Sequence, residues 1–131
     1  MRKSIIAIAG VTALSGAAFA QMAAPKFLSL QPADMLSSNV VGVDVYDTAN
    51  HDIGTIKDIA FDSSKTVKGY VLSVGGFLGM GAHYVIVDTD SVKVKYDDAD
   101  KKWHANMNAT KDQLTAAPEF KYEGQWNATK S

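Results

Sequence analysis

Two aspartates flank a short apolar segment and are the carboxylates whose spacing could support catalysis. Asp58 and Asp62 stand on either side of residues 59–61, and general acid–base catalysis needs such a pair in a cleft that shifts a pKa. The two would meet only if a strand bends between them. The alternative is structural, with Asp62 beginning a turn and Asp58 accepting hydrogen bonds from nearby backbone. We favour the structural alternative, predict no catalytic residue, and expect that the protein is not an enzyme.

Three histidines could ligate a metal ion only if the fold brought them together: His51, His83 and His104. They lie in one predicted turn and on two different predicted strands, without the His-x-x-x-His spacing of a helical site, and the chain has no cysteine to complete one. We therefore expect solvated or edge histidines and predict no metal site.

A short acidic loop offers oxygen atoms that a hard cation could bind. It contains Asp97, Asp98 and Asp100, but it lacks the glycine and the distal glutamate that a calcium-binding loop requires. We interpret it as a solvated turn. The sequence thus predicts no metal ligand and no cofactor.

A glycine-rich segment, residues 75–81, is the strongest candidate for a contact surface. It lacks the spacing of a phosphate-binding loop and leads into a predicted strand, so it offers no helix N-terminus to an anion. The apolar residues at its tip either fold back onto the domain or stay exposed, and soluble monomers usually avoid an exposed apolar tip. Our candidate partner-contact loop consists of Phe77, Leu78, Gly79 and Met80.

These candidates are separated by segments in which apolar residues recur every second position, as β-strands require. The segments are 40–46, 53–61, 66–74, 83–88, 92–96 and 102–107. Polar turns join them as hairpins, and the period slips near Gly54, which predicts a bulge with close backbone approach. We predict an all-β fold, a small closed or partly open β-barrel of about six short strands. Closure would remove exposed strand edges.

Helical signals are few. Thr110 is the predicted N-cap of one short C-terminal helix, with Leu114 facing inward and Pro118 ending it. Residues 32–36 could form one further helical turn. In the first strand, residues 41, 43 and 45 are predicted to share the buried face. Four aromatic residues are predicted to lie in the barrel core or near the termini: Tyr84, Tyr96, Trp103 and Trp126.

The first 20 residues have the three parts of a secretory signal peptide. A basic start at Arg2 and Lys3 precedes an apolar run of 5–20 that ends in a small-x-small pattern at Ala20. The run is shorter and less apolar than a spanning helix of roughly 20 residues. We predict cleavage after Ala20 and export to a bacterial periplasm, followed by a flexible leader at 21–32.

Composition limits the remaining possibilities. The chain has 131 residues, of which 13 are basic and 14 acidic, and 47% are hydrophobic, which fits one domain with a modest core. Loss of the two basic residues of the signal peptide leaves 11 basic against 14 acidic residues, a net charge of −3. A mildly acidic surface repels phosphate backbones, so we predict no nucleic-acid partner.

Three stretches resemble a known family. They are 53–59 before Phe61-Asp62, the glycine-rich segment 75–81, and 109–114 with 116–120. Together they resemble the PRC-barrel domain, named after the photosynthetic reaction centre and shared by its H subunit and a ribosome maturation factor. The resemblance covers residues 33–122, leaves 123–131 as a tail, and is greatest to small exported single-domain members from proteobacteria. It implies a small β-barrel and a role in protein contact or assembly, and we transfer no functional residue from either relative.

Residues and resemblance together predict a non-catalytic periplasmic binding module that mediates protein contact or assembly at the cell envelope. Its partner would be an unknown protein or a second copy of the chain. After signal cleavage no integral membrane span is expected. The alternative is a small-molecule or ion binding protein that uses the barrel mouth.

Overall fold

The computed structural model describes residues 23–75 and 81–127, which belong to two units, Met1–Gln31 and Pro32–Ser131. The predicted signal peptide and the four residues of the predicted contact loop, Phe77 to Met80, lie outside the described residues. Residues 23–31 of the first unit contain no helix or strand. All the elements discussed below belong to the second unit.

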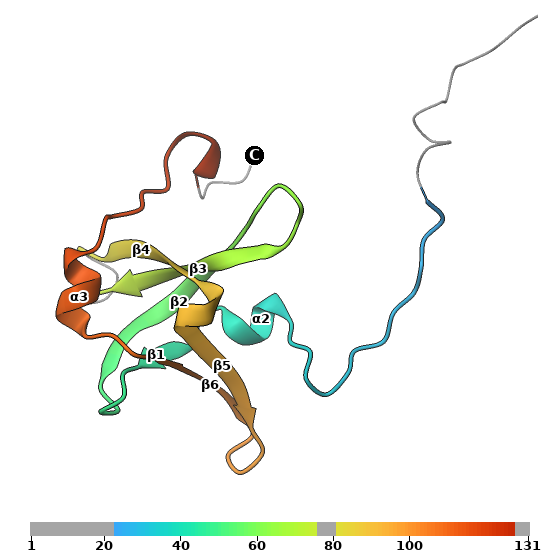
Figure 1. The fold of residues 1–131 in the computed structure, drawn as a ribbon, viewed down its shortest axis with the longest axis horizontal. Coiled ribbons are helices and arrows are strands. Elements are labelled where there is room, and N and C mark those ends of the chain that lie inside the picture. Colours follow the sequence, from blue (N-terminus) through green and yellow to red (C-terminus); the bar gives the residue numbers. More distant parts are fainter. Residues whose placement is uncertain (1–22, 76–80, 128–131) are drawn as a thin grey trace, which may run out of the picture. The chain divides into compact units, whose positions relative to one another are not determined.

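The second unit is built on one six-stranded sheet with the strand order β4-β3-β2-β1-β6-β5 (Figure 1). All neighbouring strands are antiparallel except β1 and β6, which are parallel. The strands are β1 Asp44–Tyr46, β2 Asp52–Phe61, β3 Val67–Val74, β4 His83–Asp88, β5 Val92–Asp97 and β6 Lys102–Met107. The other elements are α2 Ser37–Val40, η1 Thr89–Ser91, α3 Lys111–Ala116 and η2 Gly124–Trp126. The prediction of an all-β fold with about six short strands and a short C-terminal helix is confirmed.

The sheet is not closed by hydrogen bonds, because β4 and β5 are the two ends of the strand order. Of the two predicted forms, the structure therefore has the partly open barrel. A segment after α3 runs along part of the β4 edge, where the Phe120 amide donates to the Tyr84 carbonyl over 2.7 Å. This bridge shields one edge without closing the sheet.

The start of the domain differs from the prediction. Residues 32–36 contain a turn but no helix, and the helical turn α2 begins at Ser37 instead. The Asn39 side chain accepts from the Leu36 amide, which makes Leu36 the N-cap and puts the helix start five residues later than predicted. Val40 belongs to α2, and Val41 is 40% exposed rather than on the buried face. Gly42, with φ +96°, then reverses the chain, so that β1 begins only at Asp44.

Three loops between strands begin with an aspartate whose side chain stabilises the reversal of the chain. Asp47, Asp62 and Asp97 each begin a loop, and the Oδ1 atom of each accepts the backbone N–H two residues later over 2.8–2.9 Å. Each loop contains a left-handed residue near its end, namely Asn50, Lys65 and Lys101. The aspartate thus replaces the hydrogen bonds that the backbone loses as it reverses.

The predicted irregularity near Gly54 is confirmed. Val45 pairs with Gly54 and Tyr46 with Asp52, so the register shifts at this point. A Cβ atom on Gly54 would lie 2.8 Å from the carbonyl oxygen of Ser73, closer than real Cβ atoms approach. Only glycine allows the neighbouring strand to come this near.

The core lies between the sheet and the short helices and is entirely apolar among the described residues. Its fully buried side chains are Val40, Val45, Ile53, Ile56, Leu72, Val74 and Val85. Leu114 of α3 is buried and Thr110 is the N-cap of this helix, as predicted, and the structure adds a reciprocal pair of hydrogen bonds between Thr110 and Gln113. The capped helix holds its one apolar anchor against the sheet.

Tyr84, Tyr96, Trp103 and Trp126 do not fill the core, contrary to part of the prediction, whereas Tyr70 belongs to it. Trp126 is 61% exposed and Tyr96 is 38% exposed, whereas Trp103 and Tyr84 are half-buried. They pack in pairs at the margins, with 5.3 Å between the ring centroids of Tyr96 and Trp103 and 5.4 Å between those of Tyr84 and Tyr122. Apart from Tyr70, the buried core residues are aliphatic, because the small sheet encloses little volume for large rings.

Replacing Gly69 with alanine should destabilise the fold. A Cβ atom at Gly69 would overlap the carbonyl oxygen of Val87 on β4, and forcing the strands apart costs about 1–3 kcal/mol. Urea unfolding of Gly69→Ala measures this loss. Lys68→Ala, a change at the exposed neighbouring position, serves as the control and should stay within about 0.5 kcal/mol of the parent. Equal stability of both variants would contradict the packing described here.

Candidate functional site

An apolar groove lies beside α2, where the β2–β3 hairpin approaches it. Its volume is about 240 Å³. The apolar residues that line it are Met35, Leu36, Val40, Ile59, Phe61, Val67 and Tyr70. Among the described residues no charged side chain lines it, so a group that enters the groove meets carbon atoms and few polar atoms.

The pairing of β2 with β3 positions the groove residues. Ile59 pairs with Tyr70 and Phe61 pairs with Val67, and a shift of register falls between Ala60 and Phe61. Ile59 and Phe61 both line the groove, as alternate residues of a strand should. Ile59 and Tyr70 form the inner part, while Phe61 is 56% exposed at the strand end.

The residues before α2 supply the opposite wall. Met35 and Leu36 precede the helix and are 42% and 49% exposed. Together with Phe61 and Val67 they form an exposed apolar patch around the groove. Single exposed apolar residues are common on proteins, but neighbouring ones around a concave site mark a contact surface.

The two candidate catalytic carboxylates have separate structural roles. Asp62 accepts from the Ser64 hydroxyl over 2.6 Å and from the amides of Ser64 and Thr66. These bonds, the hydroxyl first, hold the pKa of Asp62 below its ordinary 3.8. Asp62 therefore begins a turn, as the structural interpretation predicted.

Asp58 also follows the structural interpretation. Its Oδ1 accepts the Ile59 amide over 2.9 Å, and its Oδ2 accepts the Tyr122 hydroxyl over 3.2 Å. Burial, and then the negative charge of Asp58, raise the pKa of Tyr122. The carboxylate thus fastens the segment after α3 to β2.

The three histidines lie apart, each with its own partners. His51 contacts Asp47, while His83 contacts the Ala117 carbonyl over 3.2 Å and the Glu119 carboxylate over 3.7 Å. His104 lies beside Asp100 on another part of the surface. The histidines do not converge on one another.

Sequence reasoning missed the groove. Periodicity placed Ile59 and Phe61 on a strand. It did not show which other segment of the chain would pack beside their side chains. A signal was present in Met35-Leu36, two adjacent apolar residues just before a cluster of small polar ones. The loop predicted instead, from Phe77 to Met80, lies outside the described residues.

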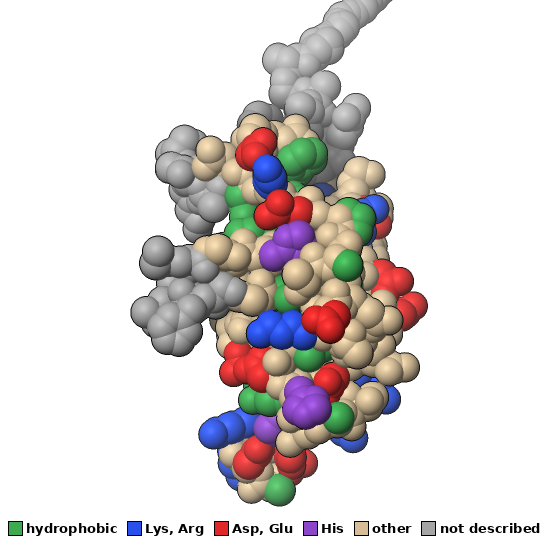
Figure 2. All heavy atoms as spheres, turned by 90° about the vertical axis from the view of Figure 1, so that its left-hand side faces the viewer, with side chains coloured by type: hydrophobic (Ala, Val, Ile, Leu, Met, Phe, Trp, Pro, Cys, Tyr) green, Lys and Arg blue, Asp and Glu red, His purple; other side chains and the backbone are tan. Residues whose placement is uncertain are grey.

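The charged surface shows mixed signs. On the side of the domain seen in Figure 2, acidic and basic side chains are interspersed and apolar atoms form small separate areas. The described residues on this side form no continuous basic patch. Within residues 23–75 and 81–127, no helix has the length and apolar character needed to cross a membrane.

A partly open six-stranded sheet around a small aliphatic core, with a short capped helix, defines a small domain of the β-barrel type. The model of the PRC-barrel domain family matches residues 33–113, which is more than half of the chain. The chain therefore belongs to the PRC-barrel domain family. No curated protein matches the sequence.

Replacing Ser64 with alanine should raise the pKa of Asp62 towards its ordinary 3.8, because the hydroxyl is the first cause of the lowered value. A carboxylate whose pKa is lowered on folding stabilises the fold above that ordinary value, and this contribution is lost as the pH falls through the folded pKa. Carboxyl ¹³C NMR titration of the folded chain measures the change. The adjacent variant Ser63→Ala is the control, and an equal effect of both variants would contradict this assignment.

Proposed function

We propose that this PRC-barrel chain is a non-catalytic binding module that mediates protein contact or assembly at the cell envelope. The apolar groove between α2 and the β2–β3 hairpin carries the proposal. Family membership supports it, because PRC-barrel domains often mediate protein interactions and are generally non-catalytic.

The groove favours one kind of ligand, an apolar side chain or short apolar segment of a partner protein. Its volume of about 240 Å³ is suited to one or two side chains, and its walls offer no charge to a polar ligand. Burying Phe61, now 56% exposed, against such a segment would remove apolar surface from water. The partner is either another protein or a second copy of this chain, and the loop Phe77 to Met80 is proposed as a second contact surface.

The first 20 residues of the sequence support a location at the cell envelope. A basic start, an apolar run and a small-x-small end support export and cleavage after Ala20. We propose that the mature chain works in a bacterial periplasm. The alternative function, binding of a small molecule or ion at the barrel mouth, would be seen as added mass in native mass spectrometry of the purified mature chain.

A photo-crosslinking amino acid at position 61 tests the proposed surface. In cells, it should form a discrete protein adduct because Phe61 stands at the groove. Tyr96 is an exposed aromatic residue that does not line the groove, and the same crosslinker there should form no matching adduct. Mass spectrometry then identifies the adduct, and the purified chain irradiated alone distinguishes a second copy from another protein. Equal adducts from both positions, or none from position 61, would overturn the groove as contact site.

Cleavage after Ala20 is a separate prediction. The chain expressed with its first 20 residues in a Gram-negative host should appear in the periplasmic fraction with Gln21 at its N-terminus, because Ala18 and Ala20 provide the small residues at the cleavage site. N-terminal sequencing and intact mass measure this. Ala20→Arg should leave the precursor uncleaved. A chain that keeps Met1 in the cytoplasm would refute export.

A further inference from the structure

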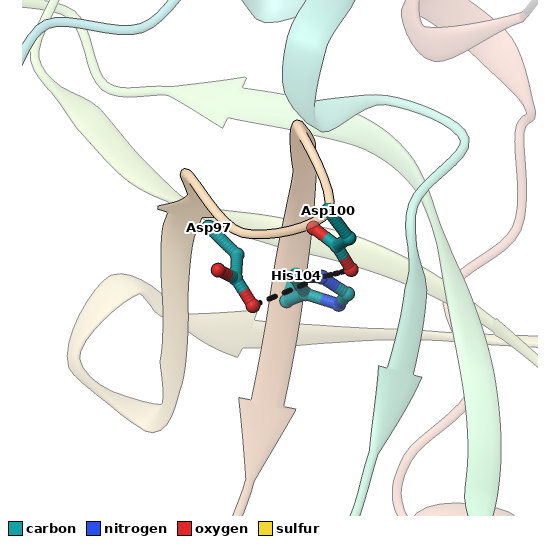
Figure 3. Close-up of side chains that lie close together, drawn as sticks. All are labelled: Asp97, Asp100 and His104. Carbon is teal, nitrogen blue, oxygen red and sulfur yellow. Dashed lines mark hydrogen bonds and ion pairs between the residues drawn. The ribbon is translucent and has the colours of Figure 1, made fainter.

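The loop between β5 and β6 brings two carboxylates and one imidazole together (Figure 3). Asp97 and Asp100 stand at the two ends of this loop, and both carboxylates point towards the ring of His104 on β6. The His104 Nε2 atom lies 2.6 Å from one oxygen of Asp100 and 3.9 Å from one oxygen of Asp97. One ligand atom of each residue lies within 4.8 Å of those of the other two.

The backbone orients both carboxylates. The Oδ1 atom of Asp97 accepts the Ala99 amide over 2.8 Å, and Oδ1 of Asp100 accepts the Lys102 amide over 3.1 Å. The second oxygen of each group, Oδ2, is the one that faces His104. Hydrogen bonds of this kind fix the direction of a metal ligand before the ion arrives.

Strand register explains why the histidine is available. Val94 pairs with Ala105 and Tyr96 with Trp103, so these residues face the core side, while His104 pairs with Lys95 on the outer face. His104 also lines an open hollow of about 810 Å³ together with Asp97, Tyr46 and Asn106. An ion can therefore reach the imidazole from solvent.

The three donor atoms fit the size of a small divalent ion. Ligand atoms around tetrahedral zinc are about 3.3 Å apart, because each lies about 2.0–2.2 Å from the metal. The distances from Nε2, 2.6 and 3.9 Å, lie on either side of that value. The three side chains are 41–50% exposed, so small rotations can adjust both distances.

We propose that Asp97, Asp100 and His104 bind a divalent transition-metal ion, with zinc as the representative case. One imidazole nitrogen with two carboxylate oxygens suits zinc and its neighbours, whereas magnesium and calcium prefer oxygen ligands alone. When Nε2 binds the ion, the neutral imidazole carries its proton on Nδ1, and water fills the remaining positions. The site is independent of the apolar groove and goes beyond the proposed protein contact.

Two neighbouring lysines are expected to lower the affinity of the site for a metal ion. Lys95 pairs with His104 and Lys102 with Asp97, and their positive charges oppose the approach of a cation. The two aspartates supply the compensating negative charge. We therefore expect one exchangeable ion rather than a permanently held structural one.

Calorimetric titration of the mature chain with zinc chloride tests the site. One ion should bind per chain, and Asp97→Asn, Asp100→Asn and His104→Gln should each weaken binding about tenfold or more. The matched control is His51→Gln, because His51 is an exposed histidine that contacts a single carboxylate, that of Asp47. Urea unfolding without metal checks that each variant folds.

A spectroscopic readout identifies the ligand atom. Long-range ¹H–¹⁵N NMR of the histidine rings should show zinc-dependent coordination at Nε2 of His104 and no such shift for His51. Binding that survives in His104→Gln would overturn the proposal. So would equal loss in His51→Gln, or absence of zinc binding in the parent chain.

Discussion

Every part of the sheet depends on a strand of three residues that pairs on both sides. β1 is antiparallel to β2 and parallel to β6, so strand hydrogen bonds connect the β2–β3–β4 strands to the β5–β6 hairpin through β1. Val45 at its centre is completely buried and pairs with Gly54 on one side and Ala105 on the other. These small neighbours leave room for the valine, whose burial holds together a strand too short to depend on hydrogen bonds alone.

An open sheet must protect its two edge strands, and this domain does so differently at each. The edge of β4 is partly covered by Phe120, whose neighbour Tyr122 packs against Tyr84. The edge strand β5 instead carries Lys93 and Lys95 on its outer face, and charged lysines discourage pairing with another strand. Closure of the barrel is therefore unnecessary for these edges to be protected.

The domain carries two surfaces of opposite chemistry, and both follow from how its strands end. Beside α2, Phe61 ends β2 and is exposed in an apolar groove without charged lining. At the end of β5, the Oδ1 atom of Asp97 accepts the amide two residues later, as those of Asp47 and Asp62 do. At Asp47 and Asp97 the second carboxylate oxygen faces a histidine, and the β5–β6 loop adds a second acid, Asp100. The same aspartate hydrogen bond thus stabilises all three loops, but it belongs to a cluster of possible metal ligands in the β5–β6 loop alone.

The sequence by itself determined the elements that depend on neighbours along the chain. The period of two located the strands, the slip near Gly54 located the bulge, and Thr110 and Pro118 located the start and end of the short helix, because each effect acts within a few residues. Only the tertiary structure decided that Val40 ends a helical turn, that β1 lies parallel to β6, and which residues meet Phe61 across the groove. It also decided that His104 faces Asp97 and Asp100. Such contacts depend on register and on packing between distant segments, and no local pattern encodes the distance between side chains that the fold alone brings together.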